Sequence, residues 1–424
     1  MKRFRWLQPG MGVKRWLAVV LLGCLLIVTG SAHLVRSRRF NTYFEDFQRV
    51  DIALMAGGLM VVVIGVALLV RSLIQTIAPE RKGDLGEMIW RNRVRLRGPK
   101  IVAVGGGTGL SVLLKGMKAF TTNLTAVVTV ADDGGSSGRL REDLKVLPPG
   151  DVRNCLVALA RSEDLLSRLF QYRFEKGGDL VGHSFGNLLI AALSDITGDF
   201  IQAIKVSSEV LAIVGEVLPS TTQDVILRAV LDDGTTVDGE TNVGKNGARI
   251  KDIMLVPGAP EPPPGVVEAI QGAEVIVLGP GSLFTSVIPN LLVPSIVTAI
   301  NAATAPVIYA ANIMTQPGET SNFNLSDHLE AIFQHTELKR IDYVLFNSGH
   351  VTDRKLKFYR SRGSTPVELD DRAHERMGPR IILDDIVSVS DFIRHDSSKL
   401  AMSVMKLVEM KMTRGVRTLR ARRV

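Results

Sequence analysis

Two long apolar stretches near the start of the chain limit most strongly what it can fold into. Residues 16–35 and 52–70 are each close to the ~20 apolar residues that cross a bilayer as a helix. The first is long for the apolar part of a signal peptide, and the second follows so soon that a helical hairpin is favoured. We therefore expect residues 1–80 to form a membrane anchor with two transmembrane helices.

The distribution of charge indicates how this anchor is oriented. Residues 1–100 hold 17 Lys and Arg against 6 Asp and Glu, with basic residues before the first span and after the second. The positive-inside rule then places both ends of the chain in the cytoplasm. Four arginines in the loop between the spans weaken this asymmetry without reversing it. The sequence predicts a multi-pass protein of the cell membrane with its main domain in the cytoplasm.

Basic charge lies at the two ends of the chain and not on its body. Residues 101–405 hold 27 Lys and Arg against 36 Asp and Glu, whereas residues 406–424 hold 7 against 1. This pattern argues against a nucleic-acid-binding domain and for contact with anionic membrane lipids. We expect residues 81–97 to be a basic linker, either at the lipid surface or simply solvated. Residues 399–424 are predicted to be a C-terminal helix with a basic tail.

From Lys100 onward, short apolar runs alternate with helical patterns. This alternation predicts an α/β, Rossmann-like body with a mainly parallel sheet and helices on both faces. Residues 218–265 differ, because period-two alternation around Asp233-Gly234 predicts a small β excursion. Sheets of this kind bind ligands at the carboxyl ends of their strands, where the strand order switches. The candidate site residues all follow predicted strands or precede predicted helices.

Two glycine-rich turns each join a predicted strand to a predicted helix. Such turns let backbone N–H groups approach a phosphate closely. Leu110 stands where a dinucleotide fingerprint has its third glycine, and the Walker lysine is absent. Two cradles on one sheet suit a diphosphate, although a tight turn without ligand is the alternative for the first. The candidate residues are Gly105, Gly106, Gly107, Thr108 and Gly109 in the first turn, and Gly279, Gly281 and Ser282 in the second.

Two carboxylates end the next predicted strand. Asp132 and Asp133 stand before two glycines, and Ser136 and Ser137 follow. Carboxylates in this position can hold a ribose hydroxyl or a Mg²⁺ ion, and the small residues let a substrate approach the backbone. A solvated turn is the alternative.

Three further segments carry candidate ligand-binding side chains. Asp151 is a natural helix N-cap, with Arg153 and Asn154 able to point at an anion. His183, with Asn187 four residues on, is either a general acid or phosphate ligand, or a structural buried histidine. A later strand is followed by Asn312, Thr315 and Gln316.

Together these motifs resemble the YvcK-like gluconeogenesis factors of the CofD/YvcK-like superfamily, which are related to 2-phospho-L-lactate transferases. The resemblance covers residues 98–398 and includes "GGGTGLSVLLKG", "VTVADDGGSSGRLR", "PPGDVRNCLVALA", "GHSFGNLL", "GPGSLFTSVIPNLLVP" and "NIMTQPGET" in family order. It implies binding of UDP-sugars, above all UDP-N-acetylglucosamine, and a role in cell shape and cell-wall precursor supply. It also implies that Tyr359 stacks on uracil and that Arg394 contacts the diphosphate.

Two functions of different classes follow from this resemblance. The first is a non-catalytic, membrane-anchored UDP-sugar-binding regulator with a protein partner in envelope synthesis and a homo-oligomeric state left open. The second is a Mg²⁺-dependent, 2-phospho-L-lactate transferase-like enzyme, in which Asp132 and Asp133 would hold the metal and act in catalysis. The acidic loop differs from that of the transferases, and few aromatic residues are present for a deazaflavin ring. These differences favour the regulator over the enzyme, and over a membrane scaffold that would leave both cradles unused.

Overall fold

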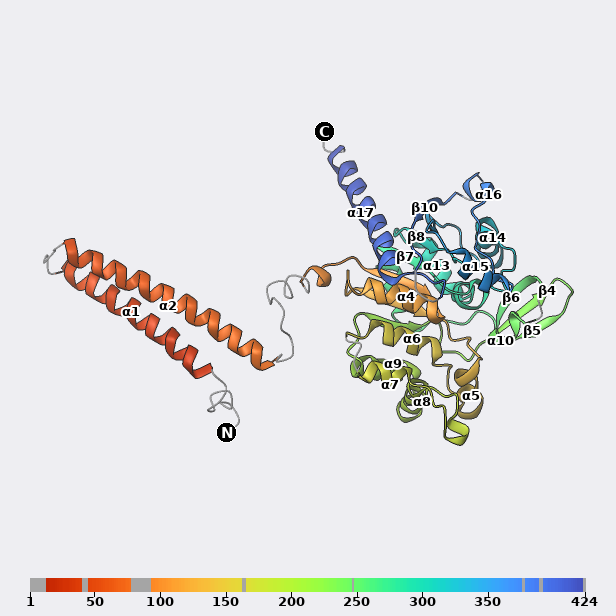
Figure 1. The fold of residues 1–424 in the computed structure, drawn as a ribbon, viewed down its shortest axis with the longest axis horizontal. Helices are drawn as coiled ribbons and strands as arrows, with labels where there is room; N and C mark the ends of the chain where they lie inside the picture. The colour runs from red at the N-terminus through yellow and green to blue at the C-terminus, as the bar shows by residue number, and fades with distance from the viewer. Residues whose placement is uncertain are drawn as a thin grey trace. The chain divides into compact units, whose positions relative to one another are not determined.

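The computed structural model describes residues 13–39, 45–77, 93–161, 165–245, 248–375, 378–388 and 392–421 (Figure 1). The chain divides into two compact units, Met1–Ile89 and Trp90–Val424. Most of the predicted basic linker, and the last three residues of the basic tail, lie outside the described residues.

The N-terminal unit is a pair of long helices, α1 (Val13–Arg39) and α2 (Glu45–Ile77). Within them, Lys14–Val35 and Arg49–Ser72 are long and apolar enough to cross a membrane. These segments begin and end within three residues of the predicted spans. Near the connecting loop, the His33 ring lies 3.1 Å from the buried carboxylate of Asp51, which joins the two helices.

Glycines let the two helices approach closely. Gly23 and Gly30 in α1, and Gly58 and Gly65 in α2, are each seven residues apart, so each pair faces the partner helix along one seam. A Cβ atom on Gly58 would lie 2.8 Å from the carbonyl oxygen of Gly23. Small residues at the contact let the backbones of two apolar helices approach this closely, as they do in helix pairs that span membranes.

The second unit is built on a seven-stranded sheet in the order β10-β9-β8-β7-β1-β2-β3, in which every pairing is parallel. From β1, which lies beside the central strand β7, the chain runs first towards β3 and later, through β7, towards β10. The strand order therefore switches between β1 and β7. The strands are β1 (Ile101–Gly105), β2 (Leu124–Val128), β3 (Glu216–Pro219), β7 (Val275–Leu278), β8 (Val307–Ala310), β9 (Tyr343–Asn347) and β10 (Arg380–Asp384).

Helices connect these strands and cover the sheet. Since crossovers between parallel strands are right-handed, connections that run in opposite directions from β1 lie on opposite faces, as the predicted doubly wound fold requires. The helices of this unit are α4 (Gly107–Met117), α5 (Gly135–Leu144), α6 (Gly150–Leu159), α7 (Leu165–Gln171), η2 (Gly178–Leu180), α8 (Phe185–Thr197), α9 (Phe200–Val210), α10 (Glu240–Val243), α11 (Val266–Gln271), η3 (Leu283–Val287), α12 (Ile288–Leu291), α13 (Pro294–Ala302), α14 (Leu325–His335), α15 (Asp353–Arg360), α16 (Asp371–Glu375) and α17 (Ser397–Ala421).

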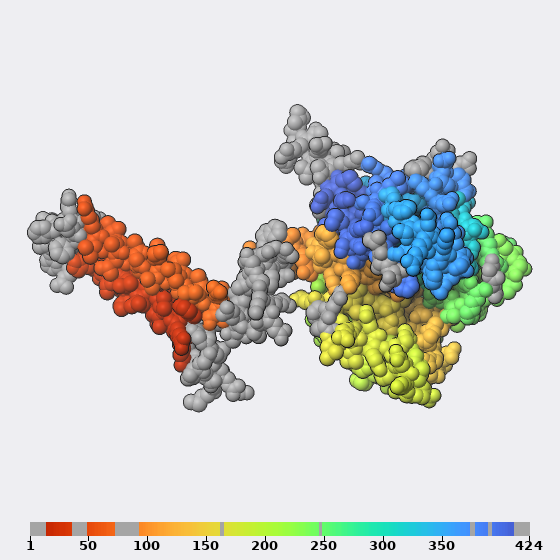
Figure 2. Space-filling view, viewed as in Figure 1, coloured from red at the N-terminus to blue at the C-terminus, as the bar shows by residue number. Residues whose placement is uncertain are grey.

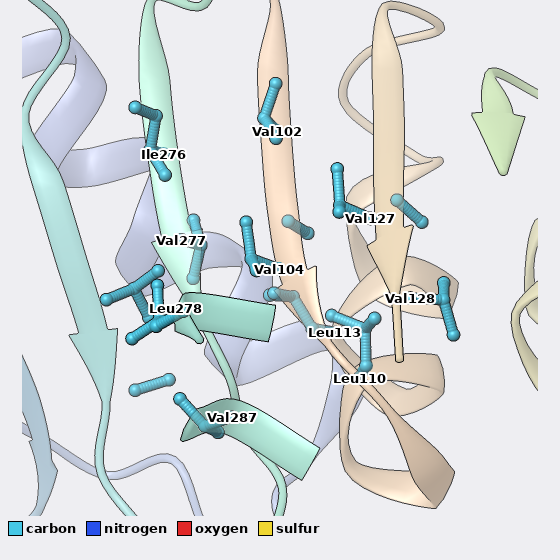
Figure 3. Close-up of a cluster of buried hydrophobic side chains, with 14 of the residues drawn as sticks. Val102, Val104, Leu110, Leu113, Val127, Val128, Ile276, Val277, Leu278 and Val287 are labelled. Atoms are coloured by element: carbon cyan, nitrogen blue, oxygen red, sulfur yellow. The ribbon is translucent and has the colours of Figure 1, made fainter. Parts of the chain in front are cut away.

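The core lies between the central strands and the helices that follow them. Every residue of β1 and β7 is buried, as is usual for strands covered on both faces. Figure 3 shows Val102 and Val104 of β1 beside Val277 of β7, with Leu110 and Leu113 of α4 packed over them. This packing holds rigid the strand ends from which both glycine loops emerge.

The C-terminal helix belongs to this core at its beginning. Leu400, Ala401 and Val404 of α17 are buried, and α17 packs against α4. A Cβ atom on Gly116 would collide with the carbonyl oxygen of Ser397. The predicted boundary at residue 398 therefore falls in the first turn of a helix that is part of the body.

The predicted β excursion is a separate three-stranded antiparallel sheet in the order β5-β4-β6. Its strands are β4 (Ile226–Leu231), β5 (Thr236–Asp238) and β6 (Ile250–Val256). It lies at one edge of the body, coloured green in Figure 2. Arg228 and Asp238, which face each other across β4 and β5, form an ion pair of 2.6 Å.

The glycine seam predicts that Gly58→Val separates α1 from α2. The added side chain would meet the backbone of Gly23 and Ile27, and the helices could pack only at a greater distance. Spin labels at Leu21 and Val63, both exposed on the hairpin, would report the distance in a Cys24→Ala background. We expect a longer and broader distance distribution.

Gly57→Val provides the matched control, because nothing lies within 4 Å of a Cβ at Gly57. An unchanged distance in Gly58→Val, or an equal change in both variants, would contradict the assignment of the seam.

Candidate functional site

The two predicted glycine turns lie side by side at the carboxyl end of the sheet. β1 pairs directly with β7, and the N–H of Gly279 donates to the carbonyl of Val104 at 2.8 Å. Gly107 and Gly279 have φ angles of +63° and +76°, which favour glycine. A Cβ atom on Gly109 would collide with the carbonyl oxygen of Pro280. The loops therefore touch, and glycine at position 109 makes this contact possible.

A cavity of about 300 Å³ opens at this contact. Nine of the predicted residues line it: Gly106, Gly107, Thr108, Gly109, Gly281, Ser282, Asn312, Gln316 and Arg394. Segments that are far apart in the sequence thus meet at the switch point, as the rule for parallel sheets predicts. Gly105 and Gly279 do not line the cavity; they end β1 and form the turn after β7.

The groups around the cavity suit an anion. Helix α4 begins at Gly107, and its N-cap, Gly106, offers no side-chain acceptor. Asp151 accepts the N–H of Gly107, and the other N–H groups of the first turn suit an anion. Across from them, the Gln316 amide donates to the Ser282 hydroxyl at 2.6 Å. The Arg394 side chain adds a positive charge. The Oδ1 of Asn312 is buried and has no hydrogen-bond partner within the described part of the chain.

Asp151 supports the first loop from beneath. The sequence suggested an N-cap, but Pro149 occupies that position and Asp151 lies in the first turn of α6. Its carboxylate accepts the N–H of Gly107, and a Cβ on Gly106 would collide with it. Burial, and next the charge of Asp132, raise the pKa of Asp151 to about 7. The N-cap prediction was wrong because the chain enters α6 already helical at Pro149.

His183 and Asn187 both contact Ser136. The Ser136 hydroxyl lies 3.1 Å from His183 Nδ1 and accepts from the Asn187 amide at 3.1 Å. The Asn187 amide lies 3.5 Å from Ser137. Burial, and then the charge of Arg139, lower the pKa of His183. These four residues do not line the 300 Å³ cavity, and the bonds fit the structural alternative for His183.

Arg153 and Asn154 are committed to the protein itself. The Arg153 guanidinium donates to Asn187 Oδ1 at 3.0 Å, to Asn154 Oδ1 at 2.8 Å and to the Ser184 hydroxyl. Arg153 therefore joins α6 to the start of α8, and it does not line the cavity between the glycine loops.

The two strand-end carboxylates have different partners. Asp132 accepts the N–H of Gly134 at 2.8 Å and the Ser137 hydroxyl; burial first, with Asp133 adding to it, raises its pKa. Asp133 accepts both the N–H and the hydroxyl of Thr241, at 2.8 and 2.7 Å. Within the described ranges, no group of three or more His, Cys, Asp and Glu side chains could hold a metal. A Mg²⁺ ion here would rely on Asp132 and on oxygens of the ligand, and this site stays a prediction.

The sequence reasoning missed two buried carboxyl groups, Glu240 and Glu319. Burial, followed by the nearby Asp132 and Asp151, raises the pKa of Glu240 to about 9. Burial raises the pKa of Glu319 to about 7. Glu240 lines the cavity although it belongs to the β excursion, where its sequence gives no sign of a binding role. Glu319 lies within the family motif "NIMTQPGET".

Thr315 and Tyr359 lie behind the cavity wall. Thr315 bonds to Thr365 through its backbone and its hydroxyl. The Tyr359 hydroxyl accepts the N–H of Ile393 at 3.1 Å, and its ring packs against a cluster that includes Ile313. Neither residue lines the cavity. Tyr359 thus supports the segment that carries Arg394, and the structure does not bring its ring to the site of an expected stacked base.

His395, next to Arg394, also lines the cavity and was not anticipated. Its Nε2 lies 3.1 Å from the carbonyl oxygen of Ala311. Burial lowers the pKa of His395 to about 4, so the ring is neutral and can donate that bond at physiological pH.

Glu240→Gln is expected to stabilise the protein at pH 8 and to change little near pH 4.5. The folded-state pKa of about 9 exceeds the ordinary value of 4.5, so the unfolded chain releases this proton first as the pH rises. The free energy of unfolding therefore decreases as the pH rises from 4.5 to about 9. Glutamine does not ionise, so the variant avoids this decrease. The expected gain at pH 8 is at most about 5 kcal/mol, since roughly 3.5 pH units separate the ordinary pKa from pH 8. It is measured by thermal unfolding of the full-length protein in detergent micelles.

Glu209→Gln, at an exposed glutamate of α9, is the control and should be neutral at both pH values. An equal gain for Glu240→Gln at pH 4.5 and pH 8 would show that the effect is not due to ionisation of Glu240.

Tyr359→Phe tests whether Tyr359 supports the backbone at Ile393 or stacks on a base of the ligand. Phenylalanine keeps a ring that could stack on a base but leaves the Ile393 N–H without its acceptor. With the UDP-N-acetylglucosamine that the family resemblance implies as ligand, we expect the affinity to fall by about 3- to 10-fold, whereas Tyr172→Phe, at an exposed tyrosine, should leave it unchanged. Unchanged binding by Tyr359→Phe together with a large loss in Tyr359→Ala would instead favour stacking.

Comparison with known proteins places the chain in a family. The family described as "2-phospho-L-lactate transferase CofD" matches residues 101–387. The gluconeogenesis factor of Bacillus subtilis is 47% identical over 312 residues, which cover 73% of this chain and 98% of that protein. A crystal structure of a UPF0052-family protein from Bacillus halodurans, 47% identical, superposes with a TM-score of 0.70 and covers 73% of this chain and 99% of that one.

A protein of Nostoc sp., described as "Putative gluconeogenesis factor", matches over a greater length. It is 44% identical over 419 residues, which cover 95% of this chain and 92% of the relative. Such a match includes most of residues 1–89. The chain therefore belongs to the CofD/YvcK family, and its relatives over most of its length are gluconeogenesis factors.

Proposed function

We propose that this protein is a non-catalytic regulator that binds a UDP-sugar, above all UDP-N-acetylglucosamine, in the cavity between the two glycine loops. The fraction of protein with ligand bound would depend on the supply of cell-wall precursors. The protein would accordingly regulate a protein partner in envelope synthesis and thereby cell shape. The helices α1 and α2 would hold the protein at the cell membrane, with the second unit in the cytoplasm.

The contact between the two glycine loops is the observation that carries this proposal. A sugar nucleotide has a diphosphate at its centre, and each loop provides close access to backbone groups for one phosphate. The start of α4 adds the positive end of a helix dipole, and Arg394 adds a full charge at the same cavity. A ligand centred on the diphosphate can then extend its two ends along the edge of the sheet.

The divergence of the paired carboxylates favours binding over catalysis. Asp133 is bonded to Thr241, so the pair does not present its oxygens together to a metal. The alternative is a Mg²⁺-dependent transferase of the 2-phospho-L-lactate type, as the description of the matching family suggests. In that case Asp132 would hold the metal together with the phosphates of the substrate.

The membrane location is supported by the apolar character of both helices and by the basic residues that flank them. The basic residues of the tail, 7 Lys and Arg against 1 Glu over residues 406–424, would be attracted to anionic lipids.

Calorimetric titration of the full-length protein in micelles with UDP-N-acetylglucosamine, with and without Mg²⁺, tests the proposal. Chromatography of the recovered ligand shows whether it has been changed. Saturable binding of an intact ligand supports the regulator. Release of nucleotide that needs Mg²⁺ and is lost in Asp132→Asn supports the transferase. Absence of binding at millimolar ligand would contradict the proposal that this protein binds a UDP-sugar.

Arg394→Gln is expected to weaken this binding by at least about 10-fold, since a charge-assisted bond to phosphate contributes roughly 1.5–3 kcal/mol. Arg362→Gln is the matched control, because Arg362 lies over the ring of Phe358 and does not line the cavity. Equal affinities for both variants would exclude Arg394 from the site.

A further inference from the structure

The small sheet β5-β4-β6 contributes one side chain to the cavity wall. Among the residues of the described chain that line the cavity, Glu240 alone comes from this segment; the others belong to the seven-stranded body. The β excursion therefore does more than extend the surface, because it completes the wall of the candidate site.

Helix α10, which begins at Glu240, is held in place on both sides. Asp133 binds the N–H and the hydroxyl of Thr241. Gly239, at φ +93°, lies so close to Asp133 that a Cβ would collide with its carboxylate. At the other end, a Cβ on Gly318 would collide with the carbonyl oxygen of Gly244. These contacts set the position of Glu240 without the help of a ligand.

The surroundings of Glu240 favour its neutral form. Its carboxyl group accepts a hydrogen bond from the side chain of Thr285, just after the second glycine loop; this bond alone acts against the neutral form and is outweighed. Burial is the main reason that its pKa rises to about 9, and the carboxyls of Asp132, Asp151 and Glu319 act in the same direction. A neutral carboxyl group does not repel an anion, and its O–H can donate a hydrogen bond.

We propose that Glu240 binds the ligand directly, by donating a hydrogen bond from its carboxyl group to a phosphate oxygen held at the Gly279–Ser282 loop. This inference rests on the proposed function, since it assigns a residue to the same diphosphate site. It makes the β excursion the part of the fold that completes phosphate recognition. It also gives Glu240 the opposite task from a metal-binding carboxylate, which would have to be ionised.

Titration of the full-length protein in micelles at pH 7, with UDP and with UDP-N-acetylglucosamine, tests this role. Glu240→Gln keeps a neutral donor of the same shape and should bind both ligands within about 2-fold of the unaltered protein. Glu240→Ala should lose about 5- to 20-fold for both ligands. Glu209→Ala, at an exposed site, should bind normally, and thermal unfolding of each variant confirms that it is folded.

The remaining outcomes separate a failure of the proposed function from a failure of this inference alone. If the unaltered protein binds neither ligand, the proposed function and this inference both fail. If it binds and Glu240→Ala binds equally well, only this inference fails. A loss confined to UDP-N-acetylglucosamine would move the contact to the sugar and overturn the phosphate assignment. Glutamine as weak as alanine would overturn the role of a neutral donor.

Discussion

The close contact of two glycine loops is the constraint on which the rest of the site depends. Gly109 faces the carbonyl of Pro280 with no space for a side chain, so the loops can share one cavity. Asn290 adds to this by donating to the carbonyl of Gly105 at 3.1 Å. The strands beneath are buried along their whole length, and this rigid base holds both loops at the rim of one cavity.

Around this point the protein separates two kinds of polar group. Glycine backbone, Ser282 and Arg394 face the cavity and suit an anion. The predicted residues Ser136, Arg153, His183 and Asn187 bond to one another instead. That network fixes the turn after β2 against α6 and α8, and Asp151 transmits the support to Gly107. Buried polar groups of this kind stabilise one arrangement only when their hydrogen bonds are made.

The two compact units of the chain use glycine for the same physical reason. In α1 and α2, Gly23 and Gly58 allow two apolar helices to pack closely. In the body, glycines allow loops to approach each other and, in our proposal, a phosphate. The absence of a Cβ thus serves helix packing in one unit and ligand access in the other.

Much of this could be predicted from the sequence, because the signals are local. The apolar spans, the strand–glycine–helix turns and the hairpin around Asp233-Gly234 depend on periodicity and turn chemistry over fewer than 25 residues. The short edge strands β3 and β10 were not anticipated. β3 has only four residues. In β10, exposed and half-buried residues do not alternate regularly, so the strand lacks a clear period of two.

Tertiary structure alone decided which polar residues reach the cavity. Asp132 and Asp133 are neighbours in sequence, but the second turns to Thr241, more than a hundred positions away. Tyr359 bonds to Ile393 behind the cavity wall, while Glu240 comes from helix α10, between strands β5 and β6 of the separate sheet. A sequence determines which side chains can bind an anion and which strands they follow. Their final direction depends on partners brought together by packing, and no local pattern contains those partners.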